Sequence, residues 1–128
     1  MLKNLEALQD VAWSFVGGTF TDRASFEVSL REYQDSAAGA FEPGELAILS
    51  PMVRLQYMCW DGNEQIEPVV TLTAENGAAF SIGDLLFQIH NAVVAQLQNI
   101  DHHFFEGLVL LAPEASEQLP SYRLRQGS

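Results

Sequence analysis

The chain has 128 residues, 48% of them hydrophobic and 18% charged, a composition that excludes a disordered chain and predicts one globular domain over residues 1–128. Its 17 Asp and Glu residues outnumber its 6 Lys and Arg residues, so the formal net charge is −11. Because such a surface repels phosphate groups, we expect neither nucleic acid nor a membrane as a partner.

The first ten residues carry leucines at every third position, namely Leu2, Leu5 and Leu8. This spacing places the three side chains on one helical face and predicts a short N-terminal helix. Gly17 and Gly18 follow and predict a turn, because glycine reaches backbone conformations that other residues avoid.

Residues 24–34 fit two patterns. Phe26, Leu30 and Tyr33 share one face of a helix, and Asp22 is a suitable residue to cap the start of that helix. The stretch also alternates between apolar and polar residues, as a half-buried strand does. We predict a strand, because the alternation matches more positions, and keep the helix as the alternative.

A long hairpin is predicted after a loop over residues 35–45 that is rich in Gly and Ala. Residues 46–60 form its first strand, in which apolar and polar side chains alternate toward the end. Asp61-Gly62-Asn63 predicts the turn, and residues 66–73 alternate again as the return strand.

The strongest helix pattern covers residues 81–99. Ser81 is a good N-cap, and the charge of Asp84 suits the positive end of the helix. Apolar residues recur at steps of three and four, which predicts one buried stripe. These residues are Ile82, Leu85, Leu86, Ile89, Val93, Leu97 and Ile100.

The outward positions of this helix carry uncharged amides instead of the usual Lys and Glu. The simplest interpretation is an ordinary helix that covers a sheet. The alternative is that another element or a partner covers the amide face, in which case a homodimer is one candidate. The amides are Gln88, Asn91, Gln96, Gln98 and Asn99.

The C-terminal part predicts a second hairpin. Residues 104–111 are apolar and end before Pro113, which favours a strand with a bulge at Gly107. Residues 119–125 alternate, as in a half-solvated strand. The predicted fold class is therefore α+β: a mainly antiparallel sheet of about four or five strands, one long helix (about 81–99) packed on one face, and a short N-terminal helix.

Two features predict where the protein resides. Its single cysteine, Cys59, excludes an internal disulfide and fits a reducing compartment. No stretch reaches the ~18 consecutive apolar residues of a membrane span. We therefore expect a cytoplasmic protein.

One cluster of metal-ligand residue types occurs, at Asp101, His102, His103 and Glu106, together with His90 more than two helical turns earlier. Adjacent residues of an extended segment point to opposite faces, so the two histidines do not converge as metal ligands must. A metal site at His102, His103 and Glu106 is kept as a weak alternative. No nucleophile motif is present, and we predict no cofactor, no catalytic residue and no enzymatic activity.

The bases are unevenly placed, because no Lys or Arg occurs between Arg54 and Arg123. Such asymmetry predicts a broad negative face that attracts a basic protein. The alternative is that the acidity serves solubility alone. The acids of this interval are Asp61, Glu64, Glu67, Glu75, Asp84, Asp101, Glu106, Glu114 and Glu117.

About the last fifty residues resemble the small, acidic, cytosolic immunity proteins that bacteria encode beside secreted toxins. The resemblance covers Phe80-Ser-Ile-Gly-Asp-Leu-Leu, Asp101-His-His-Phe-Phe-Glu-Gly-Leu and Pro120-Ser-Tyr-Arg-Leu-Arg-Gln-Gly-Ser. It implies a stoichiometric binder of a toxin domain, and it transfers no individual functional residue.

The predicted function is a non-catalytic binding protein that occludes a basic partner through an acidic face, as a toxin-neutralising immunity protein does. Exposed acids are expected to make the contacts, with one aromatic residue as anchor. The alternative is a small-molecule-binding or catalytic domain with a pocket between sheet and helix near His102 and His103. The predicted partner contacts are Trp60, Asp61, Glu64, Glu67, Glu114 and Glu117.

Overall fold

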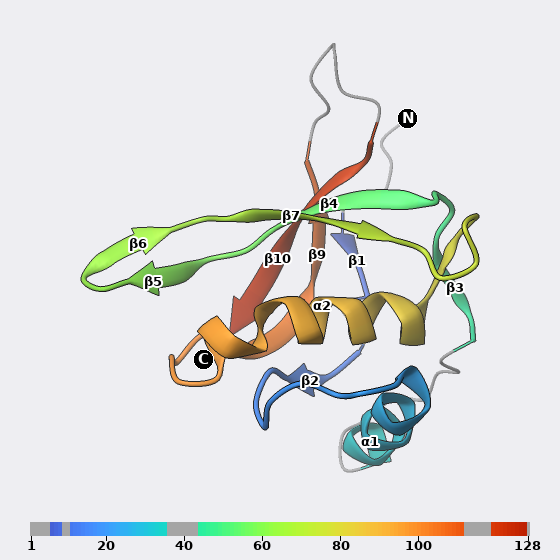
Figure 1. Cartoon of the computed structure of the whole chain (residues 1–128), viewed down its shortest axis with the longest axis horizontal. Coiled ribbons are helices and arrows are strands. Elements are labelled where there is room, and N and C mark those ends of the chain that lie inside the picture. The colour runs from blue at the N-terminus through green and yellow to red at the C-terminus, as the bar shows by residue number, and fades with distance from the viewer. Residues whose placement is uncertain (1–5, 9–10, 36–43, 112–118, 128) are drawn as a thin grey trace.

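The computed structural model describes residues 6–8, 11–35, 44–111 and 119–127. In it a curled sheet wraps one side of a long helix, α2, and a second helix, α1, packs against α2 (Figure 1). The elements, in chain order, are β1 (Glu6–Ala7), β2 (Trp13–Ser14), α1 (Arg23–Asp35), β3 (Leu46–Ile48), β4 (Met52–Gln56), β5 (Cys59–Asp61), β6 (Glu64–Ile66), β7 (Val69–Thr73), β8 (Phe80–Ser81), α2 (Ile82–Leu97), β9 (Phe104–Leu110) and β10 (Ser121–Gly127).

The main sheet has the strand order β1-β9-β10-β4-β7, and β2 also pairs with β9. Its central pair, β10 and β4, is parallel, with Tyr122 opposite Leu55. The prediction of an α+β fold is confirmed. Four of the five described strand pairs of this sheet are antiparallel, as predicted, but the parallel pair makes the sheet mixed. The two hairpins of the chain meet along this parallel pair, and alternation within each strand carries no information about which strands of separate hairpins become neighbours.

The predicted hairpin over residues 46–73 is confirmed from residue 52 onward, whereas Leu46–Ile48 form a separate strand, β3, that pairs with β8. Gln56 lies opposite Val69 in β4 and β7, and Cys59 lies opposite Ile66 in β5 and β6, so one register runs through both strand pairs. A two-residue turn closes its end. Residues 57–68, here called the arm, extend beyond the edge of the main sheet (Figure 1).

The predicted long helix is also confirmed. The side chain of Ser81 accepts a hydrogen bond from the backbone N–H of Asp84 at 3.1 Å, as an N-cap does. No helix in the described ranges combines the length and the apolar character that crossing a membrane requires. The predicted stripe lies in the core, with Ile82, Leu85, Leu86, Ile89, Val93 and Leu97 all buried.

The strand predicted over residues 24–34 is wrong, because these residues belong to α1. Asp22 caps this helix by accepting a hydrogen bond from the N–H of Ser25 at 2.7 Å, and this bond holds the pKa of its carboxyl below the usual value. Phe26 and Leu30 are buried on one face, whereas Val28 is 57% exposed. A strand would have placed these three side chains on the same face.

The short N-terminal helix is not found in the described part of residues 1–10. Glu6 and Ala7 form β1 and pair antiparallel with β9, opposite Val109 and Leu108. The backbone of Leu8 has a φ of 62°, which a helix does not allow. The backbone hydrogen bonds offered by β9 therefore outweigh the weak helical pattern of the three leucines.

The C-terminal hairpin is confirmed, with β9 and β10 antiparallel. Leu124 lies opposite Leu108 and Gln126 lies opposite Phe105, so β9 contains one residue more than β10 over this step. The extra residue produces the bulge that was predicted at Gly107, whose φ is 110°.

His90 lies in the centre of the core and is fully buried. Its Nδ1 accepts a hydrogen bond from Nε1 of Trp13 at 3.1 Å, and its Nε2 donates to the carbonyl oxygen of Gly18 at 2.7 Å. The rings of Phe20 and Phe26 lie beside it, with centroids at 5.1 and 5.7 Å. His90 therefore joins α2 to the segment that precedes α1.

Candidate functional site

The arm carries four of the six predicted partner contacts, and the other two, Glu114 and Glu117, lie outside the described residues. Trp60 and Asp61 are in β5, Glu64 is in β6, and Glu67 follows β6. All four side chains are exposed. The hairpin fold thus brings together residues that the sequence pattern had selected only for their charge and their aromatic character.

These four side chains do not share one face of the arm. Asp61 lies opposite Glu64, and Trp60 lies opposite Gln65. Because successive residues of a strand point to opposite faces, the two acids occupy one face and Trp60 occupies the other. The indole is 48% exposed.

Asp61 and Glu64 form a pair of like charges directly across the strands, an arrangement that destabilises a hairpin. Among the described residues, no arginine pairs with either carboxylate. The thiol of Cys59 is buried behind them, and burial, together with the charge of Asp61, raises its pKa. This cysteine is therefore a poor nucleophile, and the end of the arm is an acidic surface.

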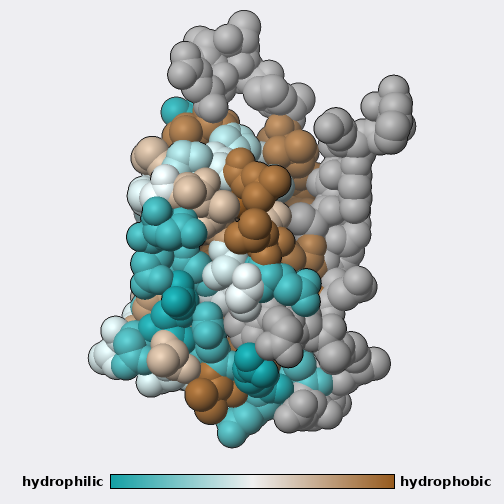
Figure 2. Space-filling model, turned by 90° about the vertical axis from the view of Figure 1, so that its right-hand side faces the viewer, coloured by the Kyte–Doolittle hydropathy of each residue, from teal (hydrophilic) through white to brown (hydrophobic). Residues whose placement is uncertain are grey.

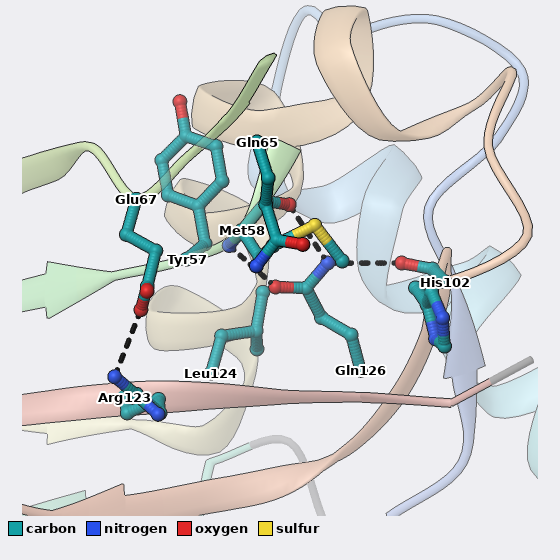
Figure 3. Close-up of a pocket in the computed structure, with 8 residues that line it drawn as sticks. All are labelled: Tyr57, Met58, Gln65, Glu67, His102, Arg123, Leu124 and Gln126. Atoms are coloured by element: carbon teal, nitrogen blue, oxygen red, sulfur yellow. Dashed lines mark hydrogen bonds and ion pairs between the residues drawn. The ribbon is translucent and has the colours of Figure 1, made fainter. Parts of the chain in front are cut away.

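Gln126 of β10 anchors the base of the arm (Figure 3). Its Oε1 accepts a hydrogen bond from the N–H of Met58 at 2.7 Å, and its Nε2 donates to the carbonyl oxygen of Met58 at 3.0 Å. The same Nε2 donates to the carbonyl oxygen of His102 at 3.0 Å. One side chain thus supplies hydrogen-bond partners for backbone groups of the arm, at the point where β4 and β10 cease to pair.

An ion pair spans the same gap, because Nη2 of Arg123 lies 2.8 Å from Oε1 of Glu67 (Figure 3). Between the arm and β10 lies an open cleft of about 250 Å³, which His102 also lines. Pockets that hold small molecules usually measure ~300–1,000 Å³. The cleft is therefore small for a ligand site, and it lies beside the arm and not between sheet and helix.

The weak metal alternative places His102, His103 and Glu106 in different surroundings. His102 is exposed at the cleft, whereas Nδ1 of His103 donates to the carbonyl oxygen of Ile100 at 2.5 Å. The carboxylate of Glu106 lies beside Gly127. Within the described residues, no three His, Cys, Asp or Glu side chains are grouped so that they could hold a metal ion.

Outside the end of the arm, arginines form ion pairs with some of the acidic residues. Nε of Arg23 lies 3.3 Å from Oε2 of Glu27, and the same guanidinium pairs with Glu75. Glu67 is paired with Arg123, as described above. The negative charge of the described chain is therefore spread over several elements, and the end of the arm is a place where it stays uncompensated.

An apolar patch lies on a different side of the molecule. Figure 2 shows hydrophobic residues gathered on the side that carries β3 in Figure 1. Leu46 of β3 is 61% exposed, and Leu49, just after it, is 81% exposed. Nothing in the described part of the chain shows what covers these leucines, so the functional proposal rests on the arm.

Sequence reasoning did not select Gln126 or Met58, which hold the arm in place. In the sequence Gln126 directly follows the strand predicted over residues 119–125, and no spacing links it to a residue 68 positions earlier. The sequence did predict the arm itself, because its two-residue turn and the alternation of apolar and polar residues are visible there.

No family model, no curated protein and no solved structure matches this chain. The resemblance to immunity proteins therefore stays a prediction.

Proposed function

We propose that this chain is a non-catalytic, cytoplasmic protein-binding module that captures a basic protein through its arm. The observation that carries the proposal is the pair Asp61 and Glu64, two exposed carboxylates held directly opposite each other with no described cation between them. A lysine or arginine of a partner, placed between the two carboxylates, replaces their repulsion by two attractions.

The net charge of −11 supports the same class of partner. A protein of this charge steers basic proteins toward itself and repels nucleic acid and acidic proteins. Occlusion of a toxin domain is the form of this function that the resemblance to immunity proteins favours.

Trp60 supplies the apolar part of the proposed contact. It is 48% exposed on the arm face opposite the two acids, so a partner that wraps around the end of the arm contacts both. Exposed tryptophans at the centre of an interface typically contribute a large share of the binding energy.

The alternative of a small-molecule site gains no support from the cleft near His102, because it is open and only about 250 Å³ in volume. Its polar groups are also engaged with one another, since Arg123 pairs with Glu67 and Gln126 binds the backbone of Met58.

The test is capture of partners from a lysate of the organism that encodes the chain, in low and in high salt. The unchanged protein is compared with the double variant Asp61→Asn/Glu64→Gln. The matched control is Glu32→Gln/Asp101→Asn, which removes the same number of charges from exposed residues outside the arm and has the same net charge, −9 in place of −11.

We expect the unchanged protein and the control to retain a basic protein in low salt, and the arm variant to retain at least about tenfold less of it. The captured protein is then identified, and its binding is repeated with both purified components. Equal capture by the arm variant and the control contradicts the assignment to the arm, and capture of no basic protein by any form contradicts the proposed function.

A further inference from the structure

Strand β7 ends the main sheet. It pairs with β4, and no other strand of the described ranges pairs with it. An edge strand presents a row of backbone N–H and C=O groups that can receive another strand. The structure defines which groups of β7 these are.

Two hydrogen bonds show which residues of β7 form hydrogen-bonded pairs with β4. The N–H of Ala74 donates to the carbonyl oxygen of Pro51 at 2.8 Å, and the N–H of Tyr57 donates to the carbonyl oxygen of Pro68 at 3.1 Å. Hydrogen-bonded residues alternate along an antiparallel strand, so the even-numbered residues of β7 direct their backbone groups toward β4. Val69, Thr71 and Thr73 therefore direct theirs toward the open edge.

This edge lacks the usual protection against strand pairing. Natural edges carry charged side chains, prolines or bulges, but β7 reads Val-Val-Thr-Leu-Thr and pairs with β4 in continuous register. At its end, the carbonyl oxygen of Thr73 accepts a hydrogen bond from Nε2 of Gln88 at 2.7 Å. Val69 is 54% exposed, and Thr71 is exposed beside it.

Negative charge flanks the open edge at both ends. Beyond Thr73, the single guanidinium of Arg23 faces two carboxylates, those of Glu27 and Glu75, which leaves one net negative charge. Before Val69, the strand continues into the arm, which ends in the opposed carboxylates of Asp61 and Glu64. The uncharged edge therefore lies between two acidic regions.

A second copy of this chain fits the edge poorly. A two-fold pairing of β7 with itself, centred on Thr71, places Glu67 of one copy opposite Glu75 of the other, because each lies four residues from the centre. Like charges in directly opposed positions destabilise a sheet. Each copy also carries a net charge of −11. Charge complementarity thus favours a different occupant, one with basic residues at both ends.

We propose that β7 receives an extended segment of the basic partner as an added strand, with Lys or Arg at the ends of that segment. This inference rests on the proposed function and specifies its binding mode. The backbone groups of Val69 and Thr71, together with the N–H of Thr73, hold the segment in register. Its apolar side chains lie beside Val70, on the side of the sheet that faces α2, and its basic ends meet the two acidic regions.

The probe is the peptide Lys-Val-Thr-Val-Thr-Val-Thr-Val-Lys with blocked ends, and the readout is amide hydrogen exchange measured residue by residue. In the free protein we expect slow exchange at Val70 and Leu72 and fast exchange at Val69 and Thr71. Saturating peptide slows exchange at Val69 and Thr71 by at least about tenfold, because their N–H groups then donate to the added strand.

Matched peptides separate strand pairing from charge attraction. Methylation of the backbone nitrogens of the third, fifth and seventh peptide residues removes the N–H groups that face β7, and we expect it to abolish the protection. Methylation of the fourth and sixth nitrogens, which face away from β7, leaves the protection in place. Replacement of both lysines by glutamate weakens binding by about tenfold or more.

A protein variant tests the same edge. Thr71→Pro removes a donor that faces away from β4, so the hairpin is retained while peptide binding falls by at least about tenfold. Thr71→Ser, which keeps the donor, binds as the unchanged protein does. If Thr71→Pro does not fold, the methylated peptides still decide the question.

Three results overturn the strand-addition proposal. The first is unchanged exchange at Val69 and Thr71 with saturating peptide, and the second is equal loss of binding with both methylation patterns. The third is concentration-dependent protection of these amides without peptide, together with a dimer in sedimentation, which assigns the edge to a second copy. In each case capture of a basic protein that depends on Asp61 and Glu64 leaves the proposed function intact.

Discussion

At the scale of single residues, His90 shows how a titratable group can serve the fold alone. Its two ring nitrogens are engaged with Trp13 and Gly18, one as acceptor and one as donor, so the neutral ring satisfies both neighbours. Burial lowers the pKa of His90, and the hydrogen bond to the carbonyl of Gly18 opposes this effect in part. A proton on Nδ1 would face the indole N–H, donor against donor.

This arrangement predicts acid lability. The unfolded chain binds a proton at His90 near the ordinary pKa of 6.5, whereas the folded chain binds it only at lower pH. The free energy of unfolding therefore falls as the pH drops below 6.5, by up to ~1.4 kcal/mol per pH unit until the lower folded pKa is reached. Urea unfolding across this range measures the slope.

The variant His90→Gln is expected to lose that part of the slope, because glutamine does not titrate. The exposed His102→Gln is the control and retains the slope of the unchanged protein. An identical slope in all three proteins would show that His90 is not the group responsible.

Gly18 is a second residue whose role follows from its backbone. Its φ is 82°, and a Cβ added there meets nothing within 4 Å, so Gly18→Ala is opposed by backbone strain and not by a clash. We expect it to lower the free energy of unfolding by about 1–2 kcal/mol. Gly44→Ala is the control: its surroundings are equally open and its φ is not in the left-handed region, so we expect no loss of stability. Thermal and urea unfolding compare the two.

At the scale of elements, carboxamide side chains replace strand pairing at three junctions. Gln126 binds the N–H and the carbonyl of Met58. Asn91 of α2 does the same for Phe20, and Gln34 of α1 does so for Ala12. Each amide donates and accepts at once, as a neighbouring strand would. This explains part of the uncharged amide face that the sequence showed on α2.

Removal of such an anchor is expected to loosen the arm. Gln126→Ala leaves the N–H and the carbonyl of Met58 without their partner and lowers the free energy of unfolding by ~1–2 kcal/mol. Amide exchange at Met58 and Cys59 should rise more than in the core of α2. Gln65→Ala, at an exposed position of the same cleft, is the matched control and should change neither quantity appreciably.

If Gln126→Ala exchanged its arm amides no faster than Gln65→Ala, the arm would be held by its own ladder alone. The ion pair between Arg123 and Glu67 is not expected to compensate, because both side chains are about half exposed, at 52% and 41%. Exposed ion pairs contribute only ~0–1 kcal/mol.

Sequence patterns predicted the elements whose own residues determine them. The long α2 has a cap and an unbroken apolar stripe, and the arm hairpin has a turn flanked by alternation. Residues 24–34 were misassigned because Val28, an exposed β-branched residue, completes an alternation that has no structural meaning. The cap at Asp22 was the more informative signal, since it predicts a specific hydrogen bond.

The alternation of apolar and polar residues could not predict which strands far apart in the sequence pair with each other. The parallel pair of β10 and β4 joins two hairpins, and the short strand β1 pairs with β9 nearly a whole chain length away. The candidate site shares this limit. Its acids and Trp60 were visible in the sequence, whereas the anchor at Gln126 and the open edge of β7 emerge only when the strand order is known.

At the scale of the whole molecule, some of the described acidic residues form ion pairs with arginines, whereas the carboxylates at the end of the arm do not. Arg23 and Arg123 hold Glu27, Glu75 and Glu67, and the opposed carboxylates of the arm face solvent. A net charge of −11 creates a long-range field, and in the proposed function the local arrangement of charges decides where a basic protein binds. We therefore propose that the arm makes the specific contact with the basic partner and that the whole surface supplies the general attraction.

The association rate of the captured basic partner, measured against ionic strength, tests this division most directly. For the unchanged protein we predict a rate that falls steeply as salt rises. Asp61→Asn/Glu64→Gln should associate at least about threefold more slowly in low salt and dissociate faster, whereas Glu32→Gln/Asp101→Asn should change the association rate alone and by less. A rate that does not depend on salt, or equal dissociation rates for the two double variants, would contradict it.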